Sequence, residues 1–335
     1  MSQTAPPQDP MSRAARLSFM RSPRLWLHAF WKFSRPHTII GTSLSVVGLF
    51  AIVWALAGSA AGQFASAPQQ ALGVLLTAWF ACLAGNVYIV GLNQVEDVEI
   101  DRINKPHLPL ASGEFSRRDG RLLVAIMGFG GLLLAVLGGP WLIFTLVTSL
   151  TIGTAYSLPP IRLKRFPFWA SFCILAVRGA VVNLGLFLHY RDRFGQPLTI
   201  APIIWALAGF VLVFSVAIAI FKDIPDIEGD RRYNIQTFTV QLGQRTVFNL
   251  ARGVLTLCYS GIIVAAPWLP GVNRPFLALT HLLVLALFWF LSFRVSGFEL
   301  WGKAERPISY PAFYQFIWKM FFVEYLLFPL ACWLA

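Results

Sequence analysis

Charged residues are scarce in this chain of 335 residues. They make up 13% of the sequence, whereas hydrophobic residues make up 57%. This composition excludes an ordinary soluble domain and indicates a protein that crosses a membrane several times. The formal net charge of +12 could suggest a nucleic-acid partner. We expect none, because the Lys and Arg residues lie mainly in the short connections between apolar runs.

Cysteine and histidine are also sparse, and their spacing does not match common metal motifs. The four cysteines are far apart in apolar segments and form no CxxC pair. The five histidines form no HxxxH pair. A zinc motif and a disulfide framework are therefore not indicated.

The N-terminal segment of about 25 residues is rich in Pro, Ser, Arg and Gln and lacks the early apolar core of a secretory signal. We expect residues 1–30 to form a mobile basic tail near anionic lipid, and residues 31–335 to form a membrane domain. The arginines could instead mark a transit peptide, although the segment is short for a plastid one.

Long apolar runs are what the sequence has in abundance. Nine of them are long enough for a membrane-spanning helix, which needs about 20 residues. They are 38–57, 70–95, 120–137, 141–158, 168–188, 199–221, 247–268, 276–293 and 314–333. The predicted fold is an all-α polytopic membrane protein with nine transmembrane helices in one bundle.

The connections between these runs differ in charge. Lys and Arg gather before the first run and after runs two, four, six and eight, whereas the opposite connections hold only Arg191, Arg193 and Arg274. Because cationic connections stay in the cytoplasm, we expect a cytoplasmic N-terminus and a C-terminus across the membrane.

Two acidic clusters directly follow apolar runs two and six, although a carboxylate costs about 2.5–3.5 kcal/mol at the centre of a membrane helix. A spacing of four residues recurs in both clusters and puts the ligands on one helical face. The candidate metal ligands are Asn93, Asp97, Asp101, Asp223, Asp226 and Asp230.

Both clusters follow even-numbered spans, so they are predicted to lie on the same, cytoplasmic side of the membrane. Oxygen ligands of this kind suit Mg²⁺, which commonly binds one or two carboxylates together with the phosphates of a substrate. We therefore expect Mg²⁺ as cofactor and a diphosphate as ligand. Asp97, Asp101, Asp226 and Asp230 are the candidate catalytic carboxylates.

A diphosphate also needs cations and hydrogen-bond donors near these carboxylates. The candidates are Lys105, Tyr156, Arg162, Lys164 and Lys222, together with Arg178 and Asn183 from the fifth span. Arg231 and Arg232 flank the second cluster, but topology alone also accounts for cytoplasmic cations. Arg178 lies inside a span, where a charge requires a partner or a wet cavity, so it is predicted to be functional or part of a buried structural pair.

At these residues the chain resembles the UbiA-type superfamily of intramembrane aromatic prenyltransferases, whose hallmark is two aspartate-rich motifs on one membrane face. Segment 93–101 continuing into 104–114 is similar to the homogentisate prenyltransferase branch, which includes the phytyltransferases of tocopherol (vitamin E) biosynthesis. Segments 31–38, 241–244 and 316–325 agree with that branch. Position 107 departs from the pattern of the branch, because it is His107 where a larger aromatic residue is expected in many relatives. The short N-terminal segment is similar to that of cyanobacterial members of the family. This similarity implies that the protein lies in a thylakoid or plasma membrane.

The resemblance implies transfer of a prenyl group, with phytyl diphosphate as the expected donor, to homogentisate with loss of carbon dioxide. No protein partner is inferred. Geranylgeranyl and solanesyl donors, or acceptors such as hydroxybenzoate or chlorophyllide, remain alternatives. A transporter would place its ionisable residues near the membrane midplane, and a lipid-binding or assembly protein would not need two aspartate motifs.

Overall fold

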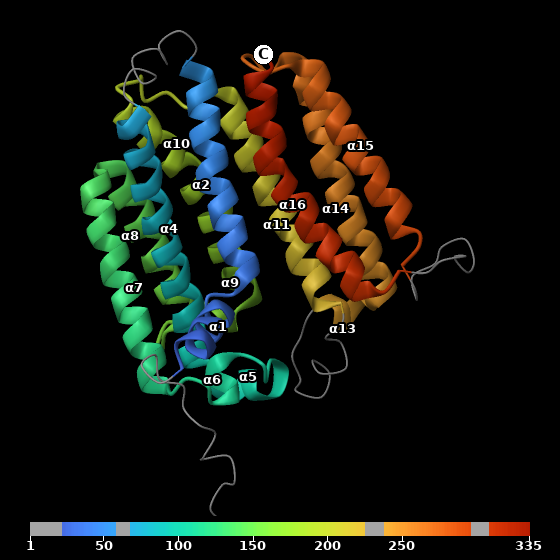
Figure 1. Ribbon diagram of the computed structural model, residues 1–335. Coiled ribbons are helices and arrows are strands. Elements are labelled where there is room, and N and C mark those ends of the chain that lie inside the picture. Colours follow the sequence, from blue (N-terminus) through green and yellow to red (C-terminus); the bar gives the residue numbers. More distant parts are fainter. Residues whose placement is uncertain (1–21, 58–67, 225–237, 296–307) are drawn as a thin grey trace, which may run out of the picture.

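The computed structural model of the protein describes residues 22–57, 68–224, 238–295 and 308–335. Within these ranges the chain is a bundle of long helices, and Figure 1 shows them running roughly alongside one another. The long helices are α2 (Pro36–Ala57), α4 (Pro68–Glu96), α7 (Arg117–Gly138), α8 (Pro140–Ser157), α11 (Pro202–Asp223), α14 (Gln244–Ala265), α15 (Arg274–Ser292) and α16 (Tyr310–Trp333). A further long helix is built from α9 (Pro167–Leu175), the π-helical segment η3 (Ala176–Val181) and α10 (Val182–Arg193). The all-α prediction is therefore confirmed.

Eight of the helices described are long and apolar enough to cross a membrane. The predicted span 141–158 corresponds to α8, which belongs to the bundle but does not meet this criterion. Threonine and serine lower its apolar character, and among them Thr145, Ser149 and Thr154 hydrogen-bond to backbone carbonyls one turn back. Such bonding lets a polar hydroxyl lie inside a helical bundle, because the group is satisfied within its own helix.

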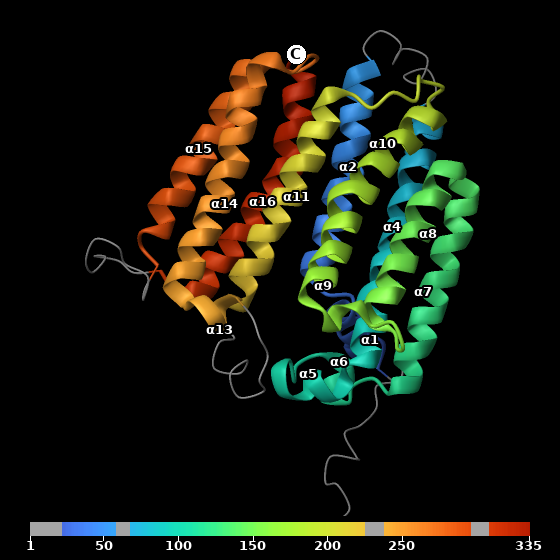
Figure 2. The same cartoon turned by 180° about the vertical axis from the view of Figure 1, so that it is seen from behind.

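The bundle has two sides. α4 packs against α2, α7 and α8 on one side, and α11 packs against α14 and α16 on the other. Figures 1 and 2 show the same division from opposite directions. α2 contacts α16, and η3 contacts α11, so these helices join the two sides.

Short helices gather at one end of the bundle, shown at the bottom of Figure 1. They are α1 (Pro23–Phe33), α5 (Val98–Asn104), α6 (Pro109–Ser112) and α13 (Phe238–Leu242), and the 3₁₀ turn η2 (Leu163–Arg165) follows α8. Phe33, Val98 and Phe115 belong to one small apolar cluster that holds this end together. The ends of α4, α8 and α11 that carry the predicted site lie at this same end of the bundle, as the charge pattern predicts.

The predicted mobile tail of residues 1–30 requires a correction at its C-terminal end. Residues 1–21 lie outside the described residues, but α1 already begins at Pro23. Ala29 and Phe33 on one face of this helix are buried against the bundle, whereas Leu25, Leu27 and Trp31 are exposed. Packing of the buried face stabilises the helix, since most helical stability in proteins comes from tertiary contacts.

Candidate active site

Asp97 lies where α4 ends and α5 begins. Helix α4 stops at Glu96, and Asp97 has a ψ angle of 17°, outside the α-helical region. Backbone hydrogen bonds nevertheless continue from Asp97 to Asn93 and from Asp101 to Asp97, at 3.1 and 2.7 Å. The chain therefore changes direction at Asp97, as the orientation of α5 in Figure 1 shows, and the predicted helical face is not continuous. The backbone hydrogen bonds between the candidate ligands, which are four residues apart, are kept.

Two cations from the connection after α8 bind the Asp97 carboxylate. Arg162 donates a hydrogen bond to Asp97 Oδ1 at 2.8 Å, and Lys164 Nζ forms an ion pair with Oδ2. Asn93 also donates to Oδ2 at 3.2 Å. The structure thus brings two predicted diphosphate-binding residues, Arg162 and Lys164, to Asp97, although more than sixty residues separate them in sequence.

Arg35 also contacts this cluster, and its role was not predicted. Its guanidinium lies 3.5 Å from Asn93 Oδ1 and interacts electrostatically with Asp101. Both Arg35 and Arg162 have positive φ angles, 54° and 40°, in the left-handed region that non-glycine residues rarely adopt. Strained backbone of this kind often marks a functional site. The sequence signals were the Arg-Pro pair next to a span and the position of Arg35 in segment 31–38, which agrees with the homogentisate prenyltransferase branch.

Asp101 is 5% exposed, and its Oδ2 has no hydrogen-bond partner among the described residues. Burial raises the pKa of its carboxyl group, while Lys105, Arg35 and Lys164 counteract the rise and Asp97 adds to it. A buried carboxylate oxygen without a partner is unusual in a folded protein. A cation or a protonated ligand would satisfy it.

Lys164 is also partly withdrawn from water. Burial lowers the pKa of its amino group, and the hydrogen bond and the charge of Asp97 act in the opposite direction. The pair of opposite charges, Lys164 and Asp97, is thus largely buried, with each side chain only 13% exposed. In such surroundings charges interact more strongly than at a protein surface.

The second acidic cluster can be followed only to its first residues. α11 ends at Asp223, and Lys222 is exposed at the same end of the bundle. Asp226, Asp230, Arg231 and Arg232 lie outside the described residues. In the part of the chain that the structure describes, no three His, Cys, Asp or Glu side chains gather in one place. A site built from both clusters therefore stays a prediction.

Tyr156 and Lys105 lie at the expected end. Tyr156 is on the last turn of α8 and partly buried, shortly before the segment that carries Arg162. Lys105 follows α5 and donates its backbone N–H to the Asp101 carbonyl at 2.7 Å. Its side chain interacts electrostatically with Asp101.

Arg178 and Asn183 lie deeper in the bundle, on the π-helical segment and just after it. The Arg178 guanidinium lies over the rings of Trp318 and Phe321, 5.4 and 5.5 Å from their centroids. Asn183 donates to the carbonyls of Arg178 and Gly179, both at 2.9 Å. Neither side chain contacts the Asp97 cluster directly.

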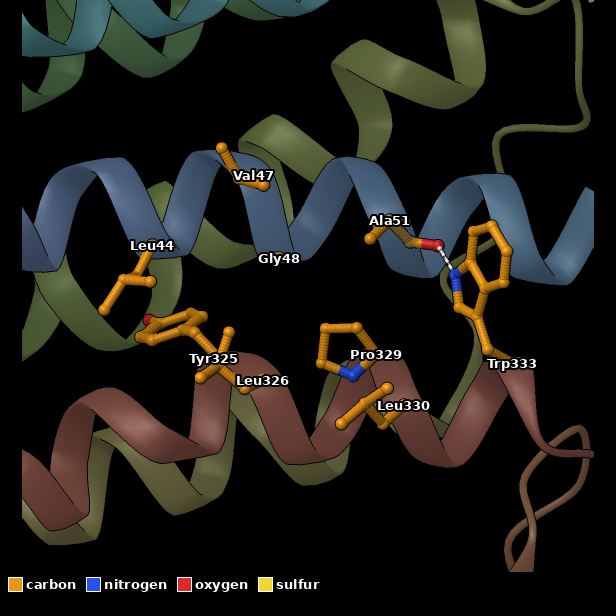
Figure 3. Close-up of a pocket in the computed structure, with 9 residues that line it drawn as sticks. All are labelled: Leu44, Val47, Gly48, Ala51, Tyr325, Leu326, Pro329, Leu330 and Trp333. Carbon is orange, nitrogen blue, oxygen red and sulfur yellow. Dashed lines mark hydrogen bonds between the residues drawn. The ribbon is translucent and has the colours of Figure 1, made fainter.

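An apolar groove of about 340 Å³ runs between α2 and α16 (Figure 3). It is lined from Leu44 to Ala51 on one helix and from Tyr325 to Trp333 on the other. The helices come close at Gly48, where a Cβ atom would lie 2.7 Å from the Tyr325 carbonyl oxygen. Trp333 closes one end by donating to the Ala51 carbonyl at 3.0 Å.

Comparison with known proteins gives consistent results. The model of the UbiA prenyltransferase family matches residues 48–320. The homogentisate phytyltransferase of Synechocystis sp. is 52% identical over 309 residues, which cover 92% of this chain and 96% of that protein. Homogentisate phytyltransferase 1 of Arabidopsis thaliana is 41% identical, covering 90% of this chain and 75% of the relative. The homogentisate solanesyltransferase of the same plant is 38% identical, with coverage of 90% and 76%.

Solved structures share the fold at low sequence identity. A UbiA homolog from Archaeoglobus fulgidus bound to DMAPP and Mg²⁺ superposes with a TM-score of 0.63 at 15% identity, covering 91% of this chain and 99% of that one. A digeranylgeranylglyceryl phosphate synthase structure gives a TM-score of 0.60 at 18% identity, covering 92% and 99%.

Proposed function

Because the chain belongs to the UbiA prenyltransferase family, we propose that it transfers a prenyl group from a prenyl diphosphate to homogentisate, with phytyl as the expected group. The relatives that support this activity include phytyltransferases from a cyanobacterium and a plant. A solanesyltransferase is also similar, so tail length is the finer point to be tested. The product would be an intermediate of tocopherol biosynthesis.

One observation carries the proposal: two acidic side chains, Asp97 and Asp101, lie among cations at the end of an apolar bundle. Asp97 is neutralised by Arg162 and Lys164, and Asp101 keeps a buried oxygen without a partner. Carboxylate oxygens for a cation and basic side chains for phosphate are the two groups that bind a metal diphosphate.

We propose Mg²⁺ as the cofactor. The donors are oxygens, and the unpartnered Asp101 oxygen suits a hard cation. The residues that would hold it are Asn93, Asp97, Asp101, Asp223, Asp226 and Asp230. When bound, Mg²⁺ neutralises part of the negative charge that collects on a departing diphosphate.

The basic residues of the chain would receive the leaving group. As the bond between the allylic carbon and the diphosphate oxygen breaks, the bonding electrons leave with the diphosphate. The planar guanidinium of Arg162 can donate two parallel hydrogen bonds to phosphate oxygens. The ammonium groups of Lys105, Lys164 and Lys222 supply compact positive charges. Tyr156 is proposed as a hydroxyl donor from the end of α8.

The remaining allylic cation would react with the electron-rich ring of homogentisate. A new carbon–carbon bond forms, the ring loses a proton, and the side chain loses carbon dioxide and takes up a proton. The bundle must keep water from the cation, and apolar and aromatic walls do so while stabilising positive charge. The groove between α2 and α16 offers an apolar path for the prenyl tail (Figure 3).

The test is product formation by membranes that contain the protein, supplied with homogentisate and one of three donors: phytyl, geranylgeranyl or solanesyl diphosphate. We expect a phytylated quinol that forms with Mg²⁺ and is lost with EDTA. Preference for another donor would change the tail assignment. No product from any donor would contradict homogentisate as the acceptor, and hydroxybenzoate and chlorophyllide would be tried next.

The second cluster is tested by Asp226→Asn. We expect it to lose most of the turnover while the protein is still extracted folded in detergent, since the proposed metal site would lose a charged ligand. Activity close to that of the wild type would contradict the assignment of Asp226.

A further inference from the structure

A positive charge lies inside the bundle without an acidic partner among the described residues. Arg178 is on the helix from α9 to α10, and its guanidinium meets the rings of Trp318 and Phe321 on α16. The side chain is only partly buried. A charge in a membrane-spanning helix ordinarily pairs with an opposite charge or faces a polar cavity. Stacking on rings stabilises a cation only in part.

Arg178 lies in an irregular helical segment that is fixed by side-chain hydrogen bonds. The chain adopts a π-helix at residues Ala176–Val181, a form that is frequent at functional sites. Asn183 holds the segment by donating to the carbonyls of Arg178 and Gly179. The Tyr325 hydroxyl in turn donates to Asn183 Oδ1 at 3.0 Å. Both N–H groups of the Asn183 amide are thus used by backbone carbonyls and its oxygen accepts from Tyr325, which makes Asn183 a positioning residue for Arg178.

The place of Arg178 relative to the diphosphate site follows from His37. The His37 ring lies 5.3 Å from the Trp318 ring, and His37 interacts electrostatically with Arg178 and with Lys105. Lys105 interacts in the same way with Asp101. His37 thus lies near both groups: it is close to Arg178 and Trp318 on one hand, and to Lys105, the neighbour of Asp101, on the other.

This arrangement of Arg178, His37 and Trp318 suits a planar aromatic acid. The carboxylate of the acid would bind the Arg178 guanidinium. The aromatic ring of the acid would lie against His37 and Trp318, facing the allylic carbon. We infer that Arg178 binds the carboxylate of the aromatic acceptor rather than the diphosphate. The inference rests on the proposed function. It assigns to Arg178 the selection of an aromatic acceptor that carries a carboxylate on its side chain.

Arg178→Gln tests the assignment through two Michaelis constants. Removing a charged hydrogen-bonding group should raise the KM for homogentisate about 10- to 100-fold. The KM for prenyl diphosphate should stay within about twofold, because that ligand is bound by other cations. A neutral analogue, the amide of homogentisate, serves as a competitive inhibitor. Its inhibition constant should be nearly the same in the wild type and the variant, since it carries no carboxylate for the arginine to bind.

Arg252→Gln is the matched control. Arg252 is also a buried arginine on aromatic rings, with its guanidinium 4.3 Å from the centroid of Trp289, but it lies on α14. Its replacement should leave both Michaelis constants unchanged. Arg178→Lys keeps the positive charge but loses the guanidinium that binds a carboxylate with two hydrogen bonds, so it should give an intermediate KM for homogentisate. It also serves if the glutamine variant does not fold, which thermal unfolding in detergent would reveal.

The outcomes separate the two proposals. If the wild type does not prenylate homogentisate, the proposed function fails and the inference fails with it. If the wild type does so but Arg178→Gln leaves the KM for homogentisate unchanged, only the inference is overturned. A rise confined to the KM for prenyl diphosphate would also overturn it and would assign Arg178 to the leaving group.

Discussion

At the scale of single residues, Asp97 and Asp101 are one helical turn apart but have different surroundings. Asp97 is paired with Arg162 and Lys164, whereas Asp101 is buried and has an oxygen without a partner. We predict that Asp97→Asn lowers kcat at least about 100-fold, a loss typical of removing a group that stabilises charge in the transition state. Turnover with saturating prenyl diphosphate and Mg²⁺ measures it.

Glu99→Gln is the control for Asp97→Asn, because Glu99 belongs to the same motif but forms exposed ion pairs with Arg102 and Arg117. Exposed pairs contribute little, about 0–1 kcal/mol. Its activity should be close to that of the wild type. Equal losses in both variants would indicate a general effect of charge on this segment and contradict the specific role of Asp97.

At the scale of elements, α16 is held by a buried polar group that joins it to α14 and α15. Tyr259 of α14 donates to Glu324 Oε1 at 2.8 Å, and His281 Nε2 of α15 lies 3.1 Å from Oε2. All three side chains are fully buried. Because α16 also carries Trp318 and Tyr325, this contact fixes the helix that supplies the wall beside Arg178.

We predict that Glu324→Ala destabilises the protein by about 3–5 kcal/mol, the range for removing one partner of a buried pair. Thermal unfolding in detergent measures the change. Glu324→Gln is the matched variant, since its amide oxygen can still accept from Tyr259 and its volume is similar. It should unfold at a higher temperature than Glu324→Ala. An unfolding temperature equal to that of the wild type for Glu324→Ala would show that the contact does not stabilise α16.

At the scale of the whole molecule, the two acidic clusters belong to different sides of the bundle: the first follows α4, and the second follows α11. A metal diphosphate bound by both would link these sides. We predict that Mg²⁺ with inorganic diphosphate raises the unfolding temperature by a few degrees, because a ligand that binds only the folded state stabilises it. Asp97→Asn should abolish the rise, and EDTA should remove it in the wild type. A rise that persists in Asp97→Asn would place the ligand elsewhere.

The class of fold and the chemical character of the site follow from the amino-acid sequence alone. A membrane-spanning segment must satisfy its own backbone hydrogen bonds, so long apolar runs become helices whatever surrounds them. The alternation of cationic connections placed the ends of α4, α8 and α11 together, and the structure confirms this. The relatives agree with the resemblance carried by the Asn93–Asp101 spacing and its neighbours. The orientation in the membrane and the roles of Asp226 and Asp230 remain predictions.

Which side chains meet depends on how the helices pack in three dimensions. Arg35 joins the site through a left-handed backbone that no residue pattern reveals. The partners of Asp97 come from a distant connection, and Arg178 faces α16 instead of the carboxylates. The helix also breaks at Asp97, and residues 23–30 form a helix where a mobile tail was expected. These features depend on packing between distant segments, which local sequence patterns do not encode.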